Sequence, residues 1–124
     1  MNNITPTVVY DDVDRKMTKI TIDGRDTNTL TAKQDCVFGG HYHLLTNEVF
    51  EVVVGEAKLL QLAQQPAHPT KIAIHEHTYV AGEAFAIPVK EYHRLECTAG
   101  TVVKANLDRE YDPTDTYSLG NGLQ

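Results

Sequence analysis

Apolar residues recur at every second position along most of this chain, in short bursts separated by turn residues. This period matches a β-strand, in which alternate side chains point to opposite faces, and not the 3.6-residue period of a helix. Residues 16–30 show it first, with Met17, Ile20 and Ile22 beside polar neighbours and Asp23–Gly24 as a hairpin-type turn. No stretch of ten or more residues forms a convincing amphipathic helix, so the pattern predicts an all-β fold.

Further strand-like stretches follow at intervals of roughly 8 to 12 residues, which favours a sandwich or barrel. Residues 48–62 predict a hairpin that turns at Gly55, and residues 63–70, with two prolines, predict a loop. Residues 71–80, 82–97 and 99–107 supply the remaining strands. We expect the polar tail after these strands to lie over the surface.

The length and net charge of the chain indicate how many domains it forms and which partners it binds. Its 124 residues are enough for one core, so we expect a single domain over residues 1–124. A net charge of −6 without any cluster of Lys or Arg argues against nucleic acid as a partner.

The compartment is inferred from the N-terminus and the cysteines. The first residues resemble no signal peptide, and no apolar run approaches the roughly 18 to 20 residues that span a bilayer. We therefore expect no membrane association and a cytoplasmic location. Cys36 and Cys97 are read as two reduced, buried thiols, with a bridge between them as the alternative.

Two histidines separated by one residue, His41 and His43, are the first candidate site. In a strand they point to one face while Tyr42 points away, and this spacing suits a metal ion. Glu48 opens the next predicted strand on the same face as Phe50. A carboxylate on an inward face needs a compensating cation or donor, which the two imidazoles or a shared metal would provide.

A third imidazole, His93, shares an inward face with Leu95 and Cys97. A lone inward histidine is more often a hydrogen-bonded core residue than a ligand. Three imidazoles and one carboxylate that converge would instead form a mixed nitrogen and oxygen shell. Such a shell suits a divalent transition metal, namely Fe, Mn, Ni, Cu or Zn, whose identity the sequence leaves open.

Two stretches of the chain resemble the two sequence motifs of the cupin superfamily. The first motif has H-x-H, then four residues and a glutamate, then six residues and a glycine, and residues 39–55, GGHYHLLTNEVFEVVVG, match it. The second motif runs from a glycine through P-x-G to a histidine. Residues 82–97, GEAFAIPVKEYHRLEC, match it with Gly82, Pro88 and His93.

The resemblance implies a cupin-type antiparallel β-barrel, or jelly roll. It also implies that four residues of this chain match the metal ligands of the family: His41, His43, Glu48 and His93.

Three residues depart from the family motifs: Asp35 and Lys90 stand where glycines are expected, and Cys97 stands where an asparagine is expected. Lys90 would have to adopt a backbone conformation that glycine usually adopts. Cys97 is expected to pack as an apolar thiol, with a place in the pocket wall as the alternative.

More loosely, residues 39–43 and 111–117 look like the small, RmlC-like cupins that work beside sugar-nucleotide enzymes, which include isomerases and epimerases. A second H-x-H pair, His75 and His77, has no carboxylate at a matching spacing and is expected to face outward.

Three functions remain open for this pattern. The first is a metal-dependent enzyme that acts on a small oxygen-bearing metabolite as an isomerase or epimerase, a lyase or a dioxygenase. The second is a non-catalytic module that binds or senses a small ligand or sugar. The third is a metal-independent isomerase or epimerase of sugar nucleotides, with His43 or His93 as general base and Glu48 orienting it.

No further proton-transfer residue can be assigned from the sequence, although Tyr79, Glu76 and Tyr92 lie near the motifs. Exposed strand faces containing Val49, Val53 and Val103 would favour a homodimer.

Overall fold

The computed structural model describes residues 5–65 and 68–117, and within these it describes all side chains except those of residues 63–74. Among the described residues there are ten strands and no helix, so the all-β prediction is confirmed. The strands are β1 Thr7–Asp11, β2 Arg15–Ile22, β3 Arg25–Ala32, β4 Cys36–His41, β5 Glu48–Val54, β6 Glu56–Gln65, β7 His68–Val80, β8 Ala84–Ile87, β9 Tyr92–Cys97 and β10 Val102–Leu107.

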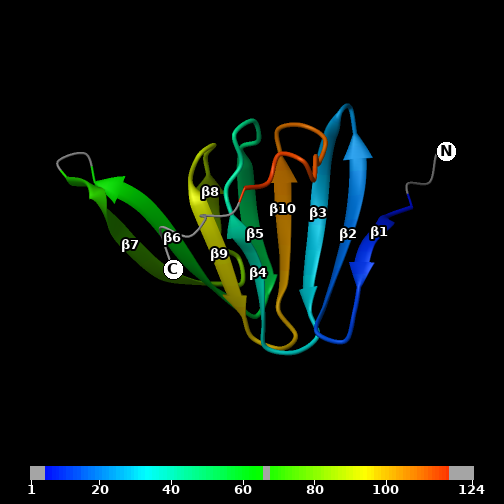
Figure 1. Ribbon diagram of the computed structural model, residues 1–124. Helices are drawn as coiled ribbons and strands as arrows, with labels where there is room; N and C mark the ends of the chain where they lie inside the picture. Colours follow the sequence, from blue (N-terminus) through cyan, green and yellow to red (C-terminus); the bar gives the residue numbers. More distant parts are fainter. Residues whose placement is uncertain (1–4, 66–67, 118–124) are drawn as a thin grey trace.

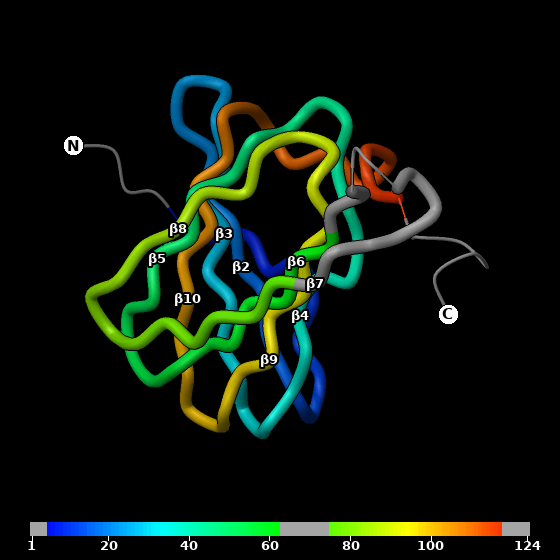
Figure 2. Tube along the Cα trace, turned by 90° about the vertical axis from the view of Figure 1, so that its left-hand side faces the viewer, coloured from blue at the N-terminus to red at the C-terminus, as the bar shows by residue number. Residues whose placement is uncertain are grey.

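The strands form two antiparallel sheets that pack face to face as a jelly roll. One sheet has the order β1-β2-β3-β10-β5-β8 and the other has the order β4-β9-β6-β7. Figure 1 shows β10 between β3 and β5, and the long hairpin of β6 and β7 extending to one side. Figure 2, turned by 90°, shows β5 and β10 on one side of the molecule and β4 and β6 on the other.

The alternation in the sequence separates the buried from the exposed faces as predicted. Along β9 the inward residues are His93, Leu95 and Cys97, and along β5 they include Phe50 and Val52. The β2–β3 hairpin turns at Asp23–Gly24, where both residues have positive φ, 52° and 73°. This is the backbone of a tight hairpin turn.

The predicted hairpin at Gly55 is wrong. β5 pairs with β10 and β8, whereas β6 pairs with β7 and β9 in the other sheet. Gly55 is therefore a corner between sheets. Its φ is 84°, and a Cβ there would lie 2.3 Å from the Thr101 hydroxyl oxygen, which makes the corner too tight for a side chain.

Two further expectations need correction. Most of the predicted loop over residues 63–70 is strand, because the β6–β7 ladder continues to the pair Gln65 and His68. Residues 66–67, with the first proline, lie outside the described residues. Pro69 falls in β7, which is the edge strand of its sheet and so tolerates a residue without an N–H. Val103 is fully buried rather than exposed, whereas Val49 and Val53 are exposed as expected.

The segment that follows β10 crosses one end of the barrel (Figure 1). Tyr117 exchanges two backbone hydrogen bonds with Tyr42, and the Asp26 N–H donates to the Arg109 carbonyl. Asp115 in this segment is 3% exposed. Only part of the tail thus lies on the surface, and residues 118–124 lie outside the described range. No described helix is long and apolar enough to span a membrane.

Candidate metal centre

Three histidines, one each from β4, β9 and the loop after β4, meet at this end of the barrel. His41 is the last residue of β4 and is the register partner of His93 on β9, and His43 follows two residues later. Their ring centroids lie 4.7 Å apart for His41 and His43, 4.7 Å for His41 and His93, and 5.4 Å for His43 and His93. One nitrogen from each ring lies within 4.8 Å of the others, so the three could hold one metal ion.

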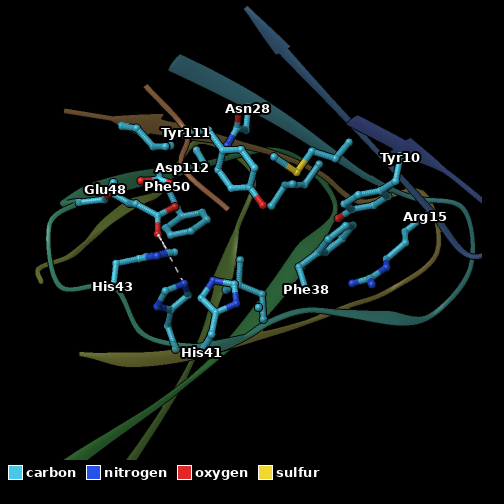
Figure 3. A pocket seen from close by; sticks show the side chains of 18 residues that line it. Tyr10, Arg15, Asn28, Phe38, His41, His43, Glu48, Phe50, Tyr111 and Asp112 are labelled. Atoms are coloured by element: carbon cyan, nitrogen blue, oxygen red, sulfur yellow. Dashed lines mark ion pairs between the residues drawn. The ribbon is translucent and has the colours of Figure 1, made fainter. Parts of the chain in front are cut away.

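Glu48 faces the three histidines from the opposite sheet. It is the first residue of β5, it is 7% exposed, and its Oε1 lies 2.8 Å from His43 Nε2 and 3.5 Å from His93 Nε2. Figure 3 shows the carboxylate directed at the imidazoles. Neither contact has hydrogen-bond geometry, so among the described residues this buried oxygen has no hydrogen-bond partner.

The tautomer of His43 makes the contact with Glu48 informative. His43 Nδ1 lies against the backbone carbonyl of Asp115, and since a carbonyl only accepts, Nδ1 carries a proton. In a neutral ring Nε2 is then an acceptor, and it faces a carboxylate oxygen that also only accepts. Two acceptors at 2.8 Å need a positive charge between them, which either a proton on Nε2 or a metal ion supplies.

His93 is oriented in the same way. Its Nδ1 donates to the Glu91 carbonyl at 3.3 Å, which leaves Nε2 directed at Glu48. Backbone carbonyls that bind one ring nitrogen and aim the other at a common point are the usual support of histidine metal ligands. The donor set and the partnerless carboxylate oxygen therefore fit a divalent cation.

Burial determines the charge state of the imidazoles. It lowers the pKa of His41 to about 4, with His93 and His43 adding to the effect, and it also lowers the pKa of His93. Burial opposes protonation of His43 too, but the contacts with Glu48 and the Asp115 carbonyl outweigh it and raise that pKa. His41 and His93 are thus neutral at pH 7, as metal ligands must be.

Asp115 fixes the loop between His43 and Glu48. Its carboxylate accepts the N–H of Leu44, the N–H of Leu45 and the hydroxyl of Thr46, at 2.9, 3.1 and 3.0 Å. These hydrogen bonds lower its pKa although burial opposes the shift. One residue therefore holds the loop with its side chain and His43 with its carbonyl.

Two backbone features bring the motifs together. At Gly39 φ is 82°, and a Cβ would lie 3.0 Å from the His93 carbonyl oxygen, so only glycine lets β4 approach β9 this closely. Lys90 has φ of 70°, which confirms that it adopts the conformation expected of the glycine it replaces. Its N–H donates to the His43 carbonyl and ties the turn before His93 to the first motif.

The cluster opens into a cavity of about 200 Å³ between the sheets. Figure 3 shows Tyr111 projecting into it from the C-terminal segment, and Arg15 at its far side. Arg15 lies over the rings of Tyr10 and Phe38, at 5.0 and 5.6 Å, and donates to the Val37 carbonyl, so it links the sheets there. The other lining residues are Met17, Asn28, Leu30, Gly39, Thr46, Phe50, Leu95, Ala105, Leu107 and Asp112.

Several residues considered from the sequence lie away from this cavity. Glu76 is exposed and pairs with Lys58, while Tyr79 stacks on Phe85 at 4.2 Å. Tyr92 is not among the lining residues. His75 and His77 are exposed, as expected. Cys97 is free and buried in the core, opposite the free, half-buried Cys36, so it packs as an apolar thiol.

Sequence reasoning missed the cavity residues outside the motifs. Asn28 could have been identified from the sequence, because it is a polar residue at an inward position of the strand pattern that became β3. Asp115 and Tyr111 belong to residues 111–117, which the sequence marked only by a loose resemblance, and no strand alternation extends to this tail to indicate which of its side chains point inward.

Comparison with known proteins identifies the fold. No protein-family model and no curated protein sequence matches the chain. Among solved structures, the capsular polysaccharide assembling protein CapF from Staphylococcus aureus matches with a TM-score of 0.75 and 24% identity over 93% of this chain. KdgF from Halomonas sp. matches with a TM-score of 0.68 and 12% identity over 86% of this chain. Oxalate decarboxylase from Bacillus subtilis matches with a TM-score of 0.73 and 12% identity over 94% of this chain.

The matched proteins differ in length. The chain spans 34% of CapF and 30% of oxalate decarboxylase, but 89% of KdgF. At these identities the likeness shows a shared fold.

Proposed function

From the cupin fold that this chain shares with those proteins, we propose that it is a metal-dependent enzyme acting on a small oxygen-bearing metabolite. One divalent transition metal ion, namely Fe, Mn, Ni, Cu or Zn, is its cofactor. The proposed ligands are His41, His43, His93 and Glu48.

The contact between Glu48 and His43 is the observation that supports this proposal most. Two buried acceptor atoms lie 2.8 Å apart, with a third acceptor, His93 Nε2, 3.5 Å from the same oxygen. A proton satisfies only one of these contacts, whereas a divalent ion neutralises the carboxylate and accepts lone pairs from all the imidazoles.

The protein's own residues perform the remaining tasks. When bound, the ion supplies Lewis-acid chemistry to a carbonyl or a developing oxyanion. The carbonyls of Asp115 and Glu91 orient His43 and His93. The apolar wall formed by Phe38, Phe50 and Leu95 keeps water from the bound substrate. Isomerase or epimerase, lyase and dioxygenase reactions all fit this arrangement.

The cavity favours a ligand of a few carbons. A volume of about 200 Å³ lies below the roughly 300–1,000 Å³ of sites for drug-sized ligands. A whole sugar nucleotide would have to leave its nucleotide outside. The RmlC-like assignment is therefore the less favoured form of the proposal.

A metal-free acid–base site is the second candidate, because Glu48 raises the pKa of His43. In that case His43 carries the proton that the contact requires and Glu48 orients it. A non-catalytic module that binds or senses a small ligand would use the same cavity without turnover.

We also propose that the protein is a cytoplasmic homodimer. Val49 and Val53, on the outward face of β5, are 45% and 44% exposed, and Val54 and Val80 are 52% and 48% exposed. Apolar side chains exposed on sheet faces favour association. Light scattering of wild type and a Val49→Lys, Val53→Lys double variant tests this, with a monomeric wild type contradicting it.

The function is tested by metal content and turnover measured on the same preparations. We expect about one divalent ion per chain in wild type purified without chelator or nickel resin, and a large loss in His93→Ala. His75→Ala is the matched control, because it removes an exposed imidazole from β7.

The preparations are then assayed with small keto-sugars, thiols and catechols, with and without oxygen. Turnover that is lost on chelation and returns with one added metal supports the enzyme. Turnover in chelated protein would select the metal-free mechanism, and bound metal without any turnover would select the binding module.

A further inference from the structure

Asn28 is a polar residue of the cavity wall that the proposed metal centre does not use. The inward residues of β3 are Asp26, Asn28, Leu30 and Ala32. Asp26 and Asn28, the polar residues of this face, lie at the end of the barrel that carries the histidines. Asn28 is the register partner of Ala105 on β10, and Ala105 is the register partner of Phe50 on β5. Phe50 is the inward residue next to Glu48 on β5.

The two polar residues of β3 differ in their partners. The Asp26 carboxylate accepts the Tyr111 N–H and the Thr21 hydroxyl, and the Lys19 ammonium lies 3.9 Å away. Asn28 is 4% exposed, and its Oδ1 is buried without a hydrogen-bond partner in the part of the chain that the structure describes. An unpartnered buried acceptor destabilises a fold, so fold stability does not explain this residue.

Tyr111 brings a hydroxyl into the same cavity. Its backbone is held on β3 by the hydrogen bond to Asp26, and Figure 3 shows its hydroxyl directed toward the cavity centre. A phenol hydroxyl carries its proton at pH 7, so it can both donate and accept a hydrogen bond. The wall thus offers the amide group of Asn28, which has no hydrogen-bond partner among the described residues, and a hydroxyl that donates or accepts a hydrogen bond.

We propose that Asn28 and Tyr111 form a subsite for a hydroxyl group of the ligand. This deepens the proposed function and rests on it. The ligand class is a short α-hydroxy carbonyl compound whose carbonyl end lies at the histidine cluster and whose second hydroxyl hydrogen-bonds to the Asn28 amide group.

The spacing of the strands fits a short ligand. Asn28 lies two strands from Phe50 across the sheet, which is about 10 Å at about 4.8 Å per strand, and Glu48 is two residues further along β5, so the backbones of Asn28 and Glu48 are about 12 Å apart. A chain of a few carbons spans the space that remains between the Asn28 amide group and a carbonyl group at the imidazoles. The surrounding wall of Met17, Leu30 and Leu95 offers apolar contacts to its carbon atoms.

The test compares the binding of paired probe compounds to wild type and variants. The two compounds of a pair differ in one group, which is a methyl group in one and a hydroxymethyl group in the other. The pairs are hydroxyacetone and dihydroxyacetone, lactate and glycerate, and allomaltol and kojic acid. Binding is measured by calorimetry on wild type, Asn28→Leu, Asn28→Ala and Tyr111→Phe, each with and without added metal. Asn106→Ala is the matched control, because this asparagine lies on neighbouring β10 but makes its contacts outside the cavity, with Thr27 and Glu51.

In wild type we expect the hydroxylated member of at least one pair to bind about tenfold or more tightly than its partner. Both Asn28 variants lose this preference, Tyr111→Phe reduces it, and Asn106→Ala keeps it. Asn28→Leu also unfolds at the same or a higher temperature than wild type, because an unpartnered acceptor has been removed. If Asn28→Leu folds poorly, the comparison rests on Asn28→Ala.

The proposal is overturned if no pair shows a preference, or if the preference survives in both Asn28 variants. Metal content measured on the same samples separates this failure from that of the proposed function. Stoichiometric metal without a hydroxyl preference overturns the subsite alone. A preference that depends on Asn28 in protein that binds no metal overturns the metal centre and leaves the subsite in place.

Discussion

At the scale of single residues, Asp115 connects the C-terminal segment to the histidine cluster. Its carboxylate satisfies three donors of the loop before Glu48, and its carbonyl fixes His43 Nδ1. A metal ligand depends on such partners for its direction as much as on its own position. The site is therefore completed by a segment that belongs to neither sequence motif.

Removing this carboxylate tests its positioning role. We expect Asp115→Ala to lower the free energy of unfolding by about 2–3 kcal/mol, because charge-assisted hydrogen bonds are lost. It should also weaken metal binding by about tenfold or more. Urea unfolding and competition with a chelator measure the two effects.

Asp35→Ala is the control for this variant, since its exposed carboxylate accepts one backbone N–H, from Ala99, at a site outside the cavity. Equal metal affinity in wild type and Asp115→Ala would contradict the positioning role.

The two cysteines should differ in reactivity. Burial raises the pKa of Cys97 to about 12, which leaves on the order of a thousandfold less thiolate than an ordinary thiol has at pH 8. We expect iodoacetamide to label half-buried Cys36 in the native protein and Cys97 only after unfolding in urea. Peptide mass spectrometry gives the two rates. Equal native rates, or cysteines that resist labelling in urea until a reductant is added, would contradict this.

At the scale of strands, the close approach of β4 and β9 sets the geometry of the cluster. We expect Gly39→Ala to destabilise the fold by about 1–3 kcal/mol, through its φ of 82° and its contact with the His93 carbonyl. Because that contact displaces His93, metal affinity should fall as well. Chemical unfolding and metal titration measure both effects.

Gly24→Ala separates the two causes. Gly24 also has positive φ, 73°, but a Cβ there meets nothing within 4 Å. We expect a smaller loss of stability, about 1 kcal/mol, and unchanged metal affinity. A Gly24 variant that binds metal as weakly as Gly39→Ala would contradict the explanation by close approach.

Strand faces could be predicted from the sequence, but strand partners could not. The alternation of side chains between the two faces of a strand correctly predicted that His93 and Glu48 point inward, because this alternation follows from backbone geometry. The same alternation holds whether β5 and β6 pair in one sheet or face each other across the core. The hairpin at Gly55 was therefore predicted wrongly, and only the tight contact with Thr101 shows why the chain changes sheets there.

At the scale of the whole molecule, the proposed metal centre joins parts of the chain that are far apart in sequence. Glu48 belongs to one sheet, His41 and His93 to the other, and Asp115 to the segment after the last strand. Long-range placement of this kind depends on packing that no local pattern encodes. For this reason the clustering of the three histidines was predictable from the motifs, whereas the roles of Asp115, Tyr111 and Arg15 were not predicted.

Because the proposed ligands lie in both sheets, metal binding should stabilise the entire fold. At a free metal concentration of about 100 times Kd we expect about 2.7 kcal/mol, or a rise in Tm on the order of 10 °C, relative to chelated protein. Differential scanning calorimetry measures this. His75→Ala should respond like wild type, and a Tm that is independent of metal would count against the proposed site.

Anomalous diffraction from crystals grown with one divalent metal tests the central claim most directly. We predict a single strong peak per chain at the point shared by the three imidazoles and Glu48, about 2.0–2.2 Å from the ligand atoms. A peak confined to the exposed His75 and His77, or no peak while Glu48 hydrogen-bonds to a protonated His43, would contradict it.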